Sequence, residues 1–211
     1  MDRFVTHEPE TGVRARSRPD PSHADEPIPI RRAQARELRE IAGLFAPALR
    51  PYRGSGSDWI LDPYLAELVD VNARFAESEV LVAEQGGRIV GTVAFYTDVR
   101  FEGWSSLPAG WAGFRALAVA PRMRRVGIGK ALVQRCIERT CDVGAKTLGI
   151  HTISGLKDAV RLYERLGFVR CPEFDLRAAD IFPSENADEM VAFAFRRDVH
   201  CDAPFTNKRD P

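Results

Sequence analysis

The residues best suited to chemistry lie in one stretch near the middle of the chain, residues 115–130. An apolar run that ends at Val119 predicts a strand, and a helix is predicted to begin near Gly127. Gly127 and Gly129 would let backbone N–H groups approach a ligand closely, and a helix N-terminus attracts negative charge. Four cations stand at the same turn, namely Arg122, Arg124, Arg125 and Lys130. The combination predicts a site for a polyanion such as a pyrophosphate.

Two familiar phosphate-binding motifs are excluded. Lys130 is followed by alanine and no glycine stands five residues before Gly129, so the stretch is not a Walker A loop. It is not a dinucleotide fingerprint either, because Leu132 occupies the position of the third glycine. Taken alone, the stretch also fits an ordinary strand-to-helix turn with exposed arginines.

The elements that would position this turn form one mixed series. The chain has 211 residues, of which 45% are apolar, and this favours a single domain with a proper core. Residues 1–27 are polar and rich in proline, so we expect a disordered or loosely packed leader. We expect the folded domain at 28–200 and a loose C-terminal tail at 201–211. The predicted order is βααβββαβαββ, which indicates an α/β layer structure.

Local patterns define these elements. Leu38 and Phe45 fall on one helical face, and Asp62-Pro63 suggests the N-cap and first position of a second helix. Gly86-Gly87 between two apolar runs predicts a two-residue hairpin turn. The later elements are strands at 114–119 and 147–153, a helix from about 127 to 143, a helix that Gly167 ends, and strands after Phe168 and at 191–195.

Composition limits the class of protein. Lys plus Arg and Asp plus Glu are 30 each, so no overall field directs the chain to nucleic acid or to an acidic membrane. No run approaches the roughly 18 apolar residues of a membrane span, and no secretory signal is evident. The four cysteines lack metal-site spacing, and we expect all four to be reduced thiols in a cytoplasmic protein: Cys136, Cys141, Cys171 and Cys201.

Two motifs together resemble a known family. Residues 124–129, Arg-Arg-Val-Gly-Ile-Gly, resemble the (Gln/Arg)-x-x-Gly-x-(Gly/Ala) signature of GNAT acyltransferases. Residues 159–168, Ala-Val-Arg-Leu-Tyr-Glu-Arg-Leu-Gly-Phe, are similar to that family's Ala-x-x-Leu-Tyr-x-x-x-Gly-Phe helix. The resemblance extends over about residues 28–197. It implies a single GNAT-like α/β domain, with a mixed, mostly antiparallel sheet of about six to seven strands flanked by helices.

The resemblance also implies acetyl-CoA as the cosubstrate, no metal, and direct transfer of an acetyl group to a primary amine of a small molecule or protein. The pyrophosphate would lie on the glycine loop, and the pantetheine arm would run beside the strand that ends at Val119. The cofactor-binding residues implied are Leu117, Ala118, Val119, Arg124, Arg125, Val126, Gly127, Ile128, Gly129 and Lys130.

For catalysis, the resemblance assigns Tyr163 as the donor of a proton or hydrogen bond to the departing thiolate. A core aromatic residue would fit the same helix. The sequence departs from the family in two places: Leu156 stands where an asparagine is frequent, and residues 114–117 offer no carboxylate base. Either another residue is the base, or the amine loses its proton to water. His151, which would titrate near neutral pH, is the best candidate base, and a structural histidine is the alternative reading. Glu102 and Asp98 are weaker candidates.

The connection 98–112 would lie on the acceptor side. There Glu102, Trp104 and Trp111 are candidate substrate contacts, and Arg115 could bind an acceptor carboxylate or pair with a surface acid. Packing of the tryptophans on the core or on a second subunit is the alternative. A non-catalytic acyl-CoA sensor remains the second functional hypothesis, and a homodimer is left open. A nucleic-acid partner is disfavoured because the net charge is zero.

Overall fold

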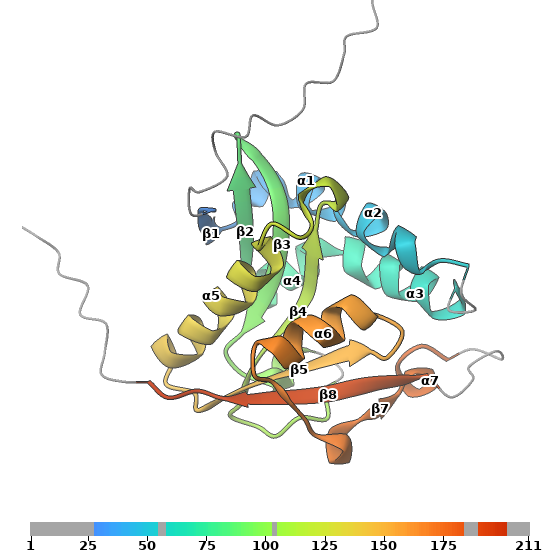
Figure 1. The fold of residues 1–211 in the computed structure, drawn as a ribbon, viewed down its shortest axis with the longest axis vertical. Coiled ribbons are helices and arrows are strands. Elements are labelled where there is room, and N and C mark those ends of the chain that lie inside the picture. The colour runs from blue at the N-terminus through green and yellow to red at the C-terminus, as the bar shows by residue number, and fades with distance from the viewer. Residues whose placement is uncertain (1–27, 55–57, 103–104, 184–189, 202–211) are drawn as a thin grey trace, which may run out of the picture.

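The computed structural model describes residues 28–54, 58–102, 105–183 and 190–201. An eight-stranded sheet runs through these residues in the order β1-β2-β3-β4-β5-β8-β6, and β7 also pairs with β8 (Figure 1). Only β4 and β5 are parallel to each other. The strands are Ile30–Arg32 (β1), Glu79–Gln85 (β2), Arg88–Tyr96 (β3), Ala112–Val119 (β4), Thr147–Ile153 (β5), Val169–Arg170 (β6), Leu176–Arg177 (β7) and Val191–Asp198 (β8).

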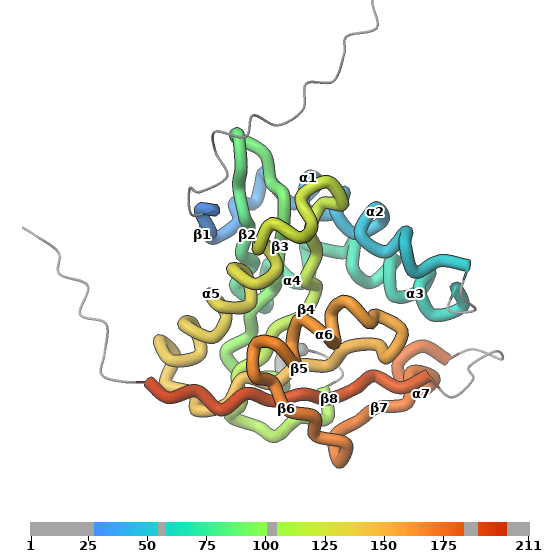
Figure 2. Tube along the Cα trace, in the orientation of Figure 1, coloured from blue at the N-terminus to red at the C-terminus, as the bar shows by residue number. Residues whose placement is uncertain are grey.

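Helices cover both faces of the sheet. They are Leu38–Ala42 (α1), Phe45–Leu49 (α2), Asp58–Val69 (α3), Val71–Glu77 (α4), Ile128–Asp142 (α5), Lys157–Arg165 (α6) and Ala178–Ile181 (α7). One apolar core lies between the sheet and α5–α6, and the other lies between the sheet and α1–α4 (Figure 2). The prediction of a mixed, mostly antiparallel α/β domain is confirmed, with the short strand β7 and helix α7 in addition. Within the described ranges, no helix is long and apolar enough to cross a membrane.

The second predicted helix begins earlier than its sequence suggested. Pro63 lies inside α3, which is already helical at Asp58, so Asp62 is not an N-cap. The earlier start places Ile60 and Leu61 in the core, where each is 1% exposed. Burial of these two side chains outweighs the hydrogen bond that Pro63 cannot donate.

Other local predictions are confirmed. Gly86 and Gly87 both have positive φ, at 57° and 71°, and they connect β2 to β3 as the two-residue hairpin turn. Gly167 has a φ of 78° and follows the end of α6, where its left-handed conformation stops the helix.

The prediction of four reduced cysteines was wrong for two of them. Cys141, near the end of α5, forms a disulfide with Cys201, just beyond β8, across 60 residues of sequence. The pairing of β5 with β8 explains the proximity, since Thr147 lies opposite Asp198 and Val199 donates to the carbonyl of Lys146. Cys136 and Cys171 are free and buried.

The sheet is irregular along β4. β4 and β5 pair only through Ala112–Leu148 and Gly113–Gly149, and beyond these residues the two strands separate (Figure 1). Ala116, in β4, has a φ of 54° at a register shift against β3. This bulge bends β4 and leaves an opening between the centres of two adjacent strands.

Candidate functional site

The glycine loop forms the tight turn that its sequence suggested. A 3-10 turn at Pro121–Met123 leads into α5, whose N-cap Gly127 has a φ of 93°. Arg125 also has positive φ, at 68°, which is uncommon for a residue with a side chain. The first N–H to bond within the helix is that of Ala131, to the carbonyl of Gly127 at 2.9 Å. The amides of the first helical turn, which include Gly129 and Lys130, therefore have no partner inside the helix and can bind an anion.

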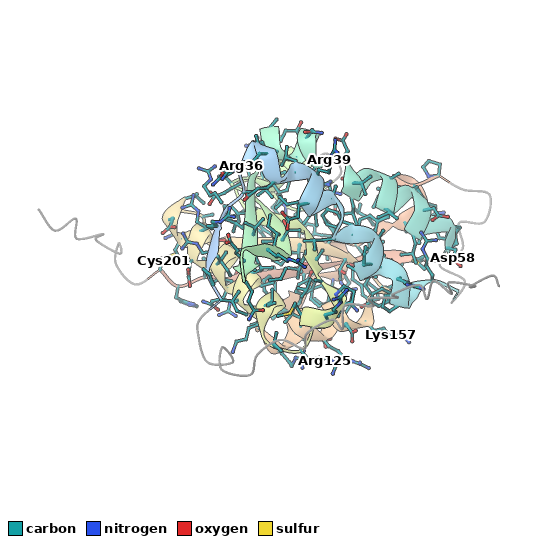
Figure 3. The ribbon with its side chains drawn as sticks, turned by 90° about the horizontal axis from the view of Figure 1, so that it is seen from above. Arg36, Arg39, Asp58, Arg125, Lys157 and Cys201 are labelled. Carbon is teal, nitrogen blue, oxygen red and sulfur yellow. A yellow bond between two sulfur atoms is a disulfide. The ribbon has the colours of Figure 1, made fainter. Side chains whose placement is uncertain are left out.

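The cations of this loop do not all face the same way. Arg122, Arg125 and Lys130 are exposed, and Figure 3 shows Arg125 at the edge of the molecule. Arg124 instead donates from Nη2 to the carbonyl oxygen of Ala48, at 2.5 Å, and so ties the loop to α2. Its guanidinium therefore has a structural contact within the protein, and its predicted contact with the cofactor stays a prediction.

The opening between β4 and β5 is a hollow that encloses about 470 Å³, including the part open to solvent. It brings together four of the predicted site residues: Arg115, Leu117, His151 and Tyr163. The remaining lining residues are Tyr64, Phe114, Ala116, Thr152, Leu156 and Ala159. Ala118 and Val119 continue β4 from the hollow toward the glycine loop.

Tyr163, on α6, is 5% exposed and sits in an aromatic cluster. Its ring centroid lies 5.7 Å from that of Phe114, 5.8 Å from Phe168 and 6.3 Å from Phe195. Burial raises the pKa of its phenol well above the usual value. The hydroxyl therefore stays protonated near neutral pH and acts as a hydrogen-bond donor. Tyr163 therefore packs in the core, as the alternative reading expected, and it also lines the hollow, while its role at the sulfur stays a prediction.

His151, on β5, is held by a neighbouring segment. Its Nε2 lies 3.0 Å from the carbonyl oxygen of Phe174 and 3.2 Å from the Oγ of Ser106. A carbonyl oxygen only accepts, so Nε2 carries the proton in the neutral ring and Nδ1 is the basic nitrogen. Burial lowers the pKa of His151 below its usual 6.5, and the ring is therefore neutral at pH 7.

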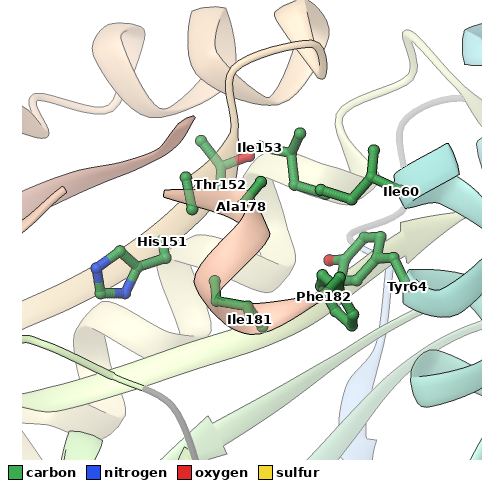
Figure 4. Close-up of a pocket in the computed structure, with 9 residues that line it drawn as sticks. Ile60, Tyr64, His151, Thr152, Ile153, Ala178, Ile181 and Phe182 are labelled. Carbon is green, nitrogen blue, oxygen red and sulfur yellow. The ribbon is translucent and has the colours of Figure 1, made fainter. Parts of the chain in front are cut away.

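A second hollow adjoins the first and shares Tyr64, His151 and Thr152 with it. The rings of Tyr64, on α3, and Phe182, just after α7, meet edge to face at 6.1 Å. Figure 4 shows His151 at one end of this hollow and the two aromatic rings at the other. The other lining residues are Ile60, Ile153, Ala178, Ile181 and Ala192. Sequence reasoning missed this aromatic wall, because α3 and α7 are more than 100 residues apart in the chain.

Arg115 belongs to a group of three charged residues beside the opening. Its Nη2 lies 3.0 Å from the Oε2 of Glu67, and the Oε1 of the same carboxylate accepts from Arg74 at 2.8 Å. The side chains of Arg115 and Arg74 are only 9% and 5% exposed. Arg74 also donates to the backbone carbonyls of Glu67 and Leu68. Arg115 and Glu67 are 48 residues apart in the sequence, so no local sequence pattern could predict their contact.

The remaining predicted residues contribute less to the site. Trp104 and the side chain of Glu102 lie outside the described residues. Asp98 bonds to Arg100 and to the N–H of Gly110. The hydrogen bond from Arg100 is the main reason that the pKa of Asp98 is lowered to about 2, and such a carboxylate is a poor base.

Trp111 packs edge to face on Phe174 at 5.8 Å, as the packing alternative for the 98–112 connection expected. In the described part of the chain, no three His, Cys, Asp or Glu side chains gather into a metal site.

Comparison with known proteins gives consistent findings. The acetyltransferase (GNAT) family model matches residues 38–168, which is more than half of the chain. A comparison with curated protein sequences found no match.

Similar solved structures include an N-acetyltransferase from Staphylococcus aureus Mu50, at 15% identity and a TM-score of 0.57, covering 83% of this chain and 100% of that one. The ribosomal-protein-S18-alanine N-acetyltransferase from Escherichia coli has 17% identity and a TM-score of 0.56, covering 84% of this chain and 97% of that one. The ribosomal-protein-alanine N-acetyltransferase from Brucella melitensis has 21% identity and a TM-score of 0.54, covering 82% and 100%. At these identities the likeness establishes the fold. Together with the family match and the glycine loop, it identifies the chain as a member of the GNAT family of acetyltransferases, with acetyl-CoA as its cosubstrate.

Proposed function

We propose that this acetyltransferase moves the acetyl group of acetyl-CoA to a primary amine of a small molecule or protein, by direct attack within a ternary complex. The observation that carries the proposal is the hollow between β4 and β5, where Leu117, His151 and Tyr163 line one space. Two substrates held there would react largely because they are positioned together.

The cofactor would lie along β4 and the start of α5. The first-turn amides of α5 and the exposed Arg125 and Lys130 are suited to the pyrophosphate. Beyond Gly113, β4 has no pairing with β5, so backbone groups from Leu117 to Val119 can hydrogen-bond to an extended pantetheine arm. An amide at the bulge would polarise the thioester carbonyl as negative charge develops on its oxygen.

The acceptor would enter from the other side, along the wall of Tyr64 and Phe182. Its amine forms the new C–N bond as the C–S bond of the thioester breaks. His151 is the candidate to accept the proton that the amine loses, and the hydroxyl of Tyr163 donates to the departing sulfur. Since the pKa of His151 is lowered and that of Tyr163 is raised, each begins in the protonation state that its role requires.

The test is acceptor-dependent release of CoA thiol from acetyl-CoA, measured against a control without acceptor. The panel contains amino acids, polyamines, aminoglycosides and peptides with a free N-terminus or lysine. Peptides belong in it because two similar structures are ribosomal-protein-alanine N-acetyltransferases. Release above the control supports the proposal, and cofactor binding without any acceptor-dependent release contradicts it.

A non-catalytic acyl-CoA sensor is the second candidate, and one observation favours it. Residues 114–117 carry no carboxylate that could serve as a base on the strand. A sensor would bind acetyl-CoA through the same loop, would not release thiol with any amine, and would not depend on His151.

The cofactor loop supports a first prediction. The double variant Arg125→Gln, Lys130→Gln is expected to raise the Kd for acetyl-CoA about tenfold, because each exposed cation contributes a modest charge-assisted contact to phosphate. The affinity of the variant should also depend less on salt. Isothermal titration at two ionic strengths measures both effects.

Arg135→Gln is the matched control for that double variant. Arg135 lies farther along α5, where it pairs with Glu138, and its loss should leave the Kd unchanged. Equal affinities for the double variant and the wild type would show that these cations do not contact the cofactor.

The role of His151 predicts a pH dependence. Because burial lowers the pKa of His151 from its usual 6.5, the ring is neutral at pH 6.5 and above, and protonation at lower pH removes the base. We expect kcat/KM, expressed per neutral amine, to fall on the acid side with the same midpoint for different acceptors, since that limb then belongs to the enzyme.

His151→Gln can still donate to the carbonyl of Phe174 but has no basic nitrogen. This variant is expected to lose the acid limb and about 100-fold in kcat/KM. A variant that keeps the wild-type pH profile would remove His151 from the mechanism.

Location and assembly stay predictions. The sequence favours the cytoplasm, but a disulfide such as Cys141–Cys201 is uncommon in a reducing compartment. The homodimer remains open, and light scattering of the purified protein would decide it.

A further inference from the structure

We infer that the acceptor is a primary amine that carries a short apolar group, and that this group occupies the second hollow, beside Tyr64 and Phe182. The inference rests on the proposed function and names the substrate class for the same site. Three observations carry it: the apolar lining of the second hollow, its connection to the opening between β4 and β5, and its small size.

The second hollow is apolar over most of its surface. Apart from Tyr64, His151 and Thr152, its lining side chains are purely hydrocarbon: Ile60, Ile153, Ala178, Ile181, Phe182 and Ala192. With His151 neutral, none of the described residues that line this hollow carries a charge. A charged group placed there would lose its water and meet hydrocarbon on most sides, whereas an alkyl group gains free energy by leaving water.

This apolar surface is accessible and is not simply part of the core. Tyr64, Ile181 and Phe182 are each only half-buried, although they line the hollow together. Ligand pockets are typically apolar surfaces of this kind with a few polar groups at one end. The surface beside the reaction centre therefore favours an acceptor with an apolar part.

Tyr64 connects the two hollows. It lines both of them, whereas Phe182 lines only the second. The two rings meet edge to face at 6.1 Å, and Figure 4 shows the hydroxyl of Tyr64 on the side of its ring that faces His151. The polar groups thus lie toward the opening, where the thioester would be attacked. An amine held at the opening would extend its apolar group past Tyr64 toward Phe182.

Two small residues set the size of the second hollow. Ala178, in α7, and Ala192, in β8, are 0% and 2% exposed, and both line it. The hollow encloses about 300 Å³, including the part that is open to solvent. The enclosed remainder suits a short alkyl group and excludes a fatty chain or a fused ring system. A larger side chain at Ala178 would fill this space.

The experiment compares amines of nearly equal size that differ in polarity. Butylamine, 3-aminopropanol and 1,3-diaminopropane are each tested with acetyl-CoA, with rates expressed per neutral amino group. We expect kcat/KM for butylamine to exceed that for each polar amine by about tenfold or more. From methylamine to butylamine, kcat/KM should rise about fourfold for each methylene that enters the hollow, which is the gain from burying one methylene.

Peptides distinguish the two sources of such an amine. A peptide that begins with valine is compared with one that begins with threonine, because these two side chains have nearly the same shape. A preference for valine identifies a protein N-terminus as the source, and a preference confined to the alkylamines identifies a free amine. Equal rates for the apolar and polar members of both sets would overturn the inference.

Variants test the assignment to the second hollow. Ala178→Val should fill the hollow and lower the butylamine-to-methylamine ratio of kcat/KM about tenfold, whereas Phe182→Ala should enlarge it and raise the hexylamine-to-butylamine ratio about fivefold. Phe75→Ala is the matched control for Phe182→Ala, since Phe75 is half-buried against the same core but lines neither hollow. If Ala178→Val does not fold, Ile181→Phe, at a half-buried position, takes its place. Ratios that stay at the wild-type values in these variants would contradict the inference.

Binding separates this inference from the proposed function. Ligand-observed NMR measures the affinities of butylamine, the valine peptide and their polar counterparts for the complex of the protein with CoA. Preferential binding of an apolar member that Ala178→Val weakens supports the inference even if no amine is acetylated, an outcome that would sink only the proposed function. Equal affinities of apolar and polar members, or no binding of any of them, overturn the inference, while acetylation of other amines would still support the proposed function.

Discussion

Replacing Tyr163 by phenylalanine is expected to lower kcat for acetyl transfer about 100-fold and to leave the Kd for acetyl-CoA within about threefold. The departing thiolate needs a proton or a strong hydrogen bond, and the buried phenol of Tyr163, whose raised pKa keeps it protonated, is the donor that we propose. Phenylalanine keeps the packing against Phe114, Phe168 and Phe195. The loss should therefore fall on turnover and not on stability.

A change of leaving group makes this test sharper. An acetyl thioester of a more acidic thiol needs less help at the sulfur, so the gap between the variant and the wild type should shrink with that donor. Tyr96→Phe is the control: Tyr96 is equally buried, at 2% exposed, but lies on β3 and outside both hollows. A Tyr163→Phe enzyme with wild-type kcat would leave Tyr163 a purely structural residue.

Much of the fold was predictable because its signals are local. The Gly86-Gly87 turn, the apolar face of α5 and the stop at Gly167 each depend on a few neighbouring residues, and each is found where the sequence placed it. The start of α3 was misjudged because a local proline signal at Pro63 competed with the burial of Ile60 and Leu61. That burial depends on the sheet, which a local pattern does not contain.

The candidate site also contains some features with local sequence signals and others that depend on tertiary contacts. The glycine loop and Tyr163 stand in motifs that can be read directly from the sequence. The partners of Arg115 and the wall of Tyr64 and Phe182 depend on how distant segments meet. Even within the loop, the sequence could not show that the guanidinium of Arg124 donates a hydrogen bond to the carbonyl of Ala48. Residue types thus indicated the cofactor, whereas the acceptor side needed the tertiary structure.

The disulfide is the clearest case of a feature hidden from the sequence. Cys141 and Cys201 lack any recognisable spacing, and the return of β8 along β5 brings them together with their Cα atoms 5.5 Å apart. The bond closes the chain from the end of α5 to the end of β8. It therefore encloses β5, α6 and the segment through α7.

Reduction of the Cys141–Cys201 bond is expected to lower the free energy of unfolding by about 4 kcal/mol, the chain-entropy value for a loop closed across 60 residues. The native contacts should persist, because Thr147 pairs with Asp198 and Val199 bonds to Lys146 without help from the disulfide. Acetyl-CoA binding at the opposite end of α5 should then change little.

Urea unfolding with and without reductant measures this difference, and Cys201→Ser is the control, since reductant should not shift its midpoint. Thiol titration gives an independent count. Cys136 and Cys171 are buried and should react only after unfolding, so the oxidised wild type should show two thiols in denaturant and the reduced protein four. Four thiols without reductant, together with a midpoint that reductant does not move, would mean that the bond does not form and would restore the expectation of a protein with four free cysteines.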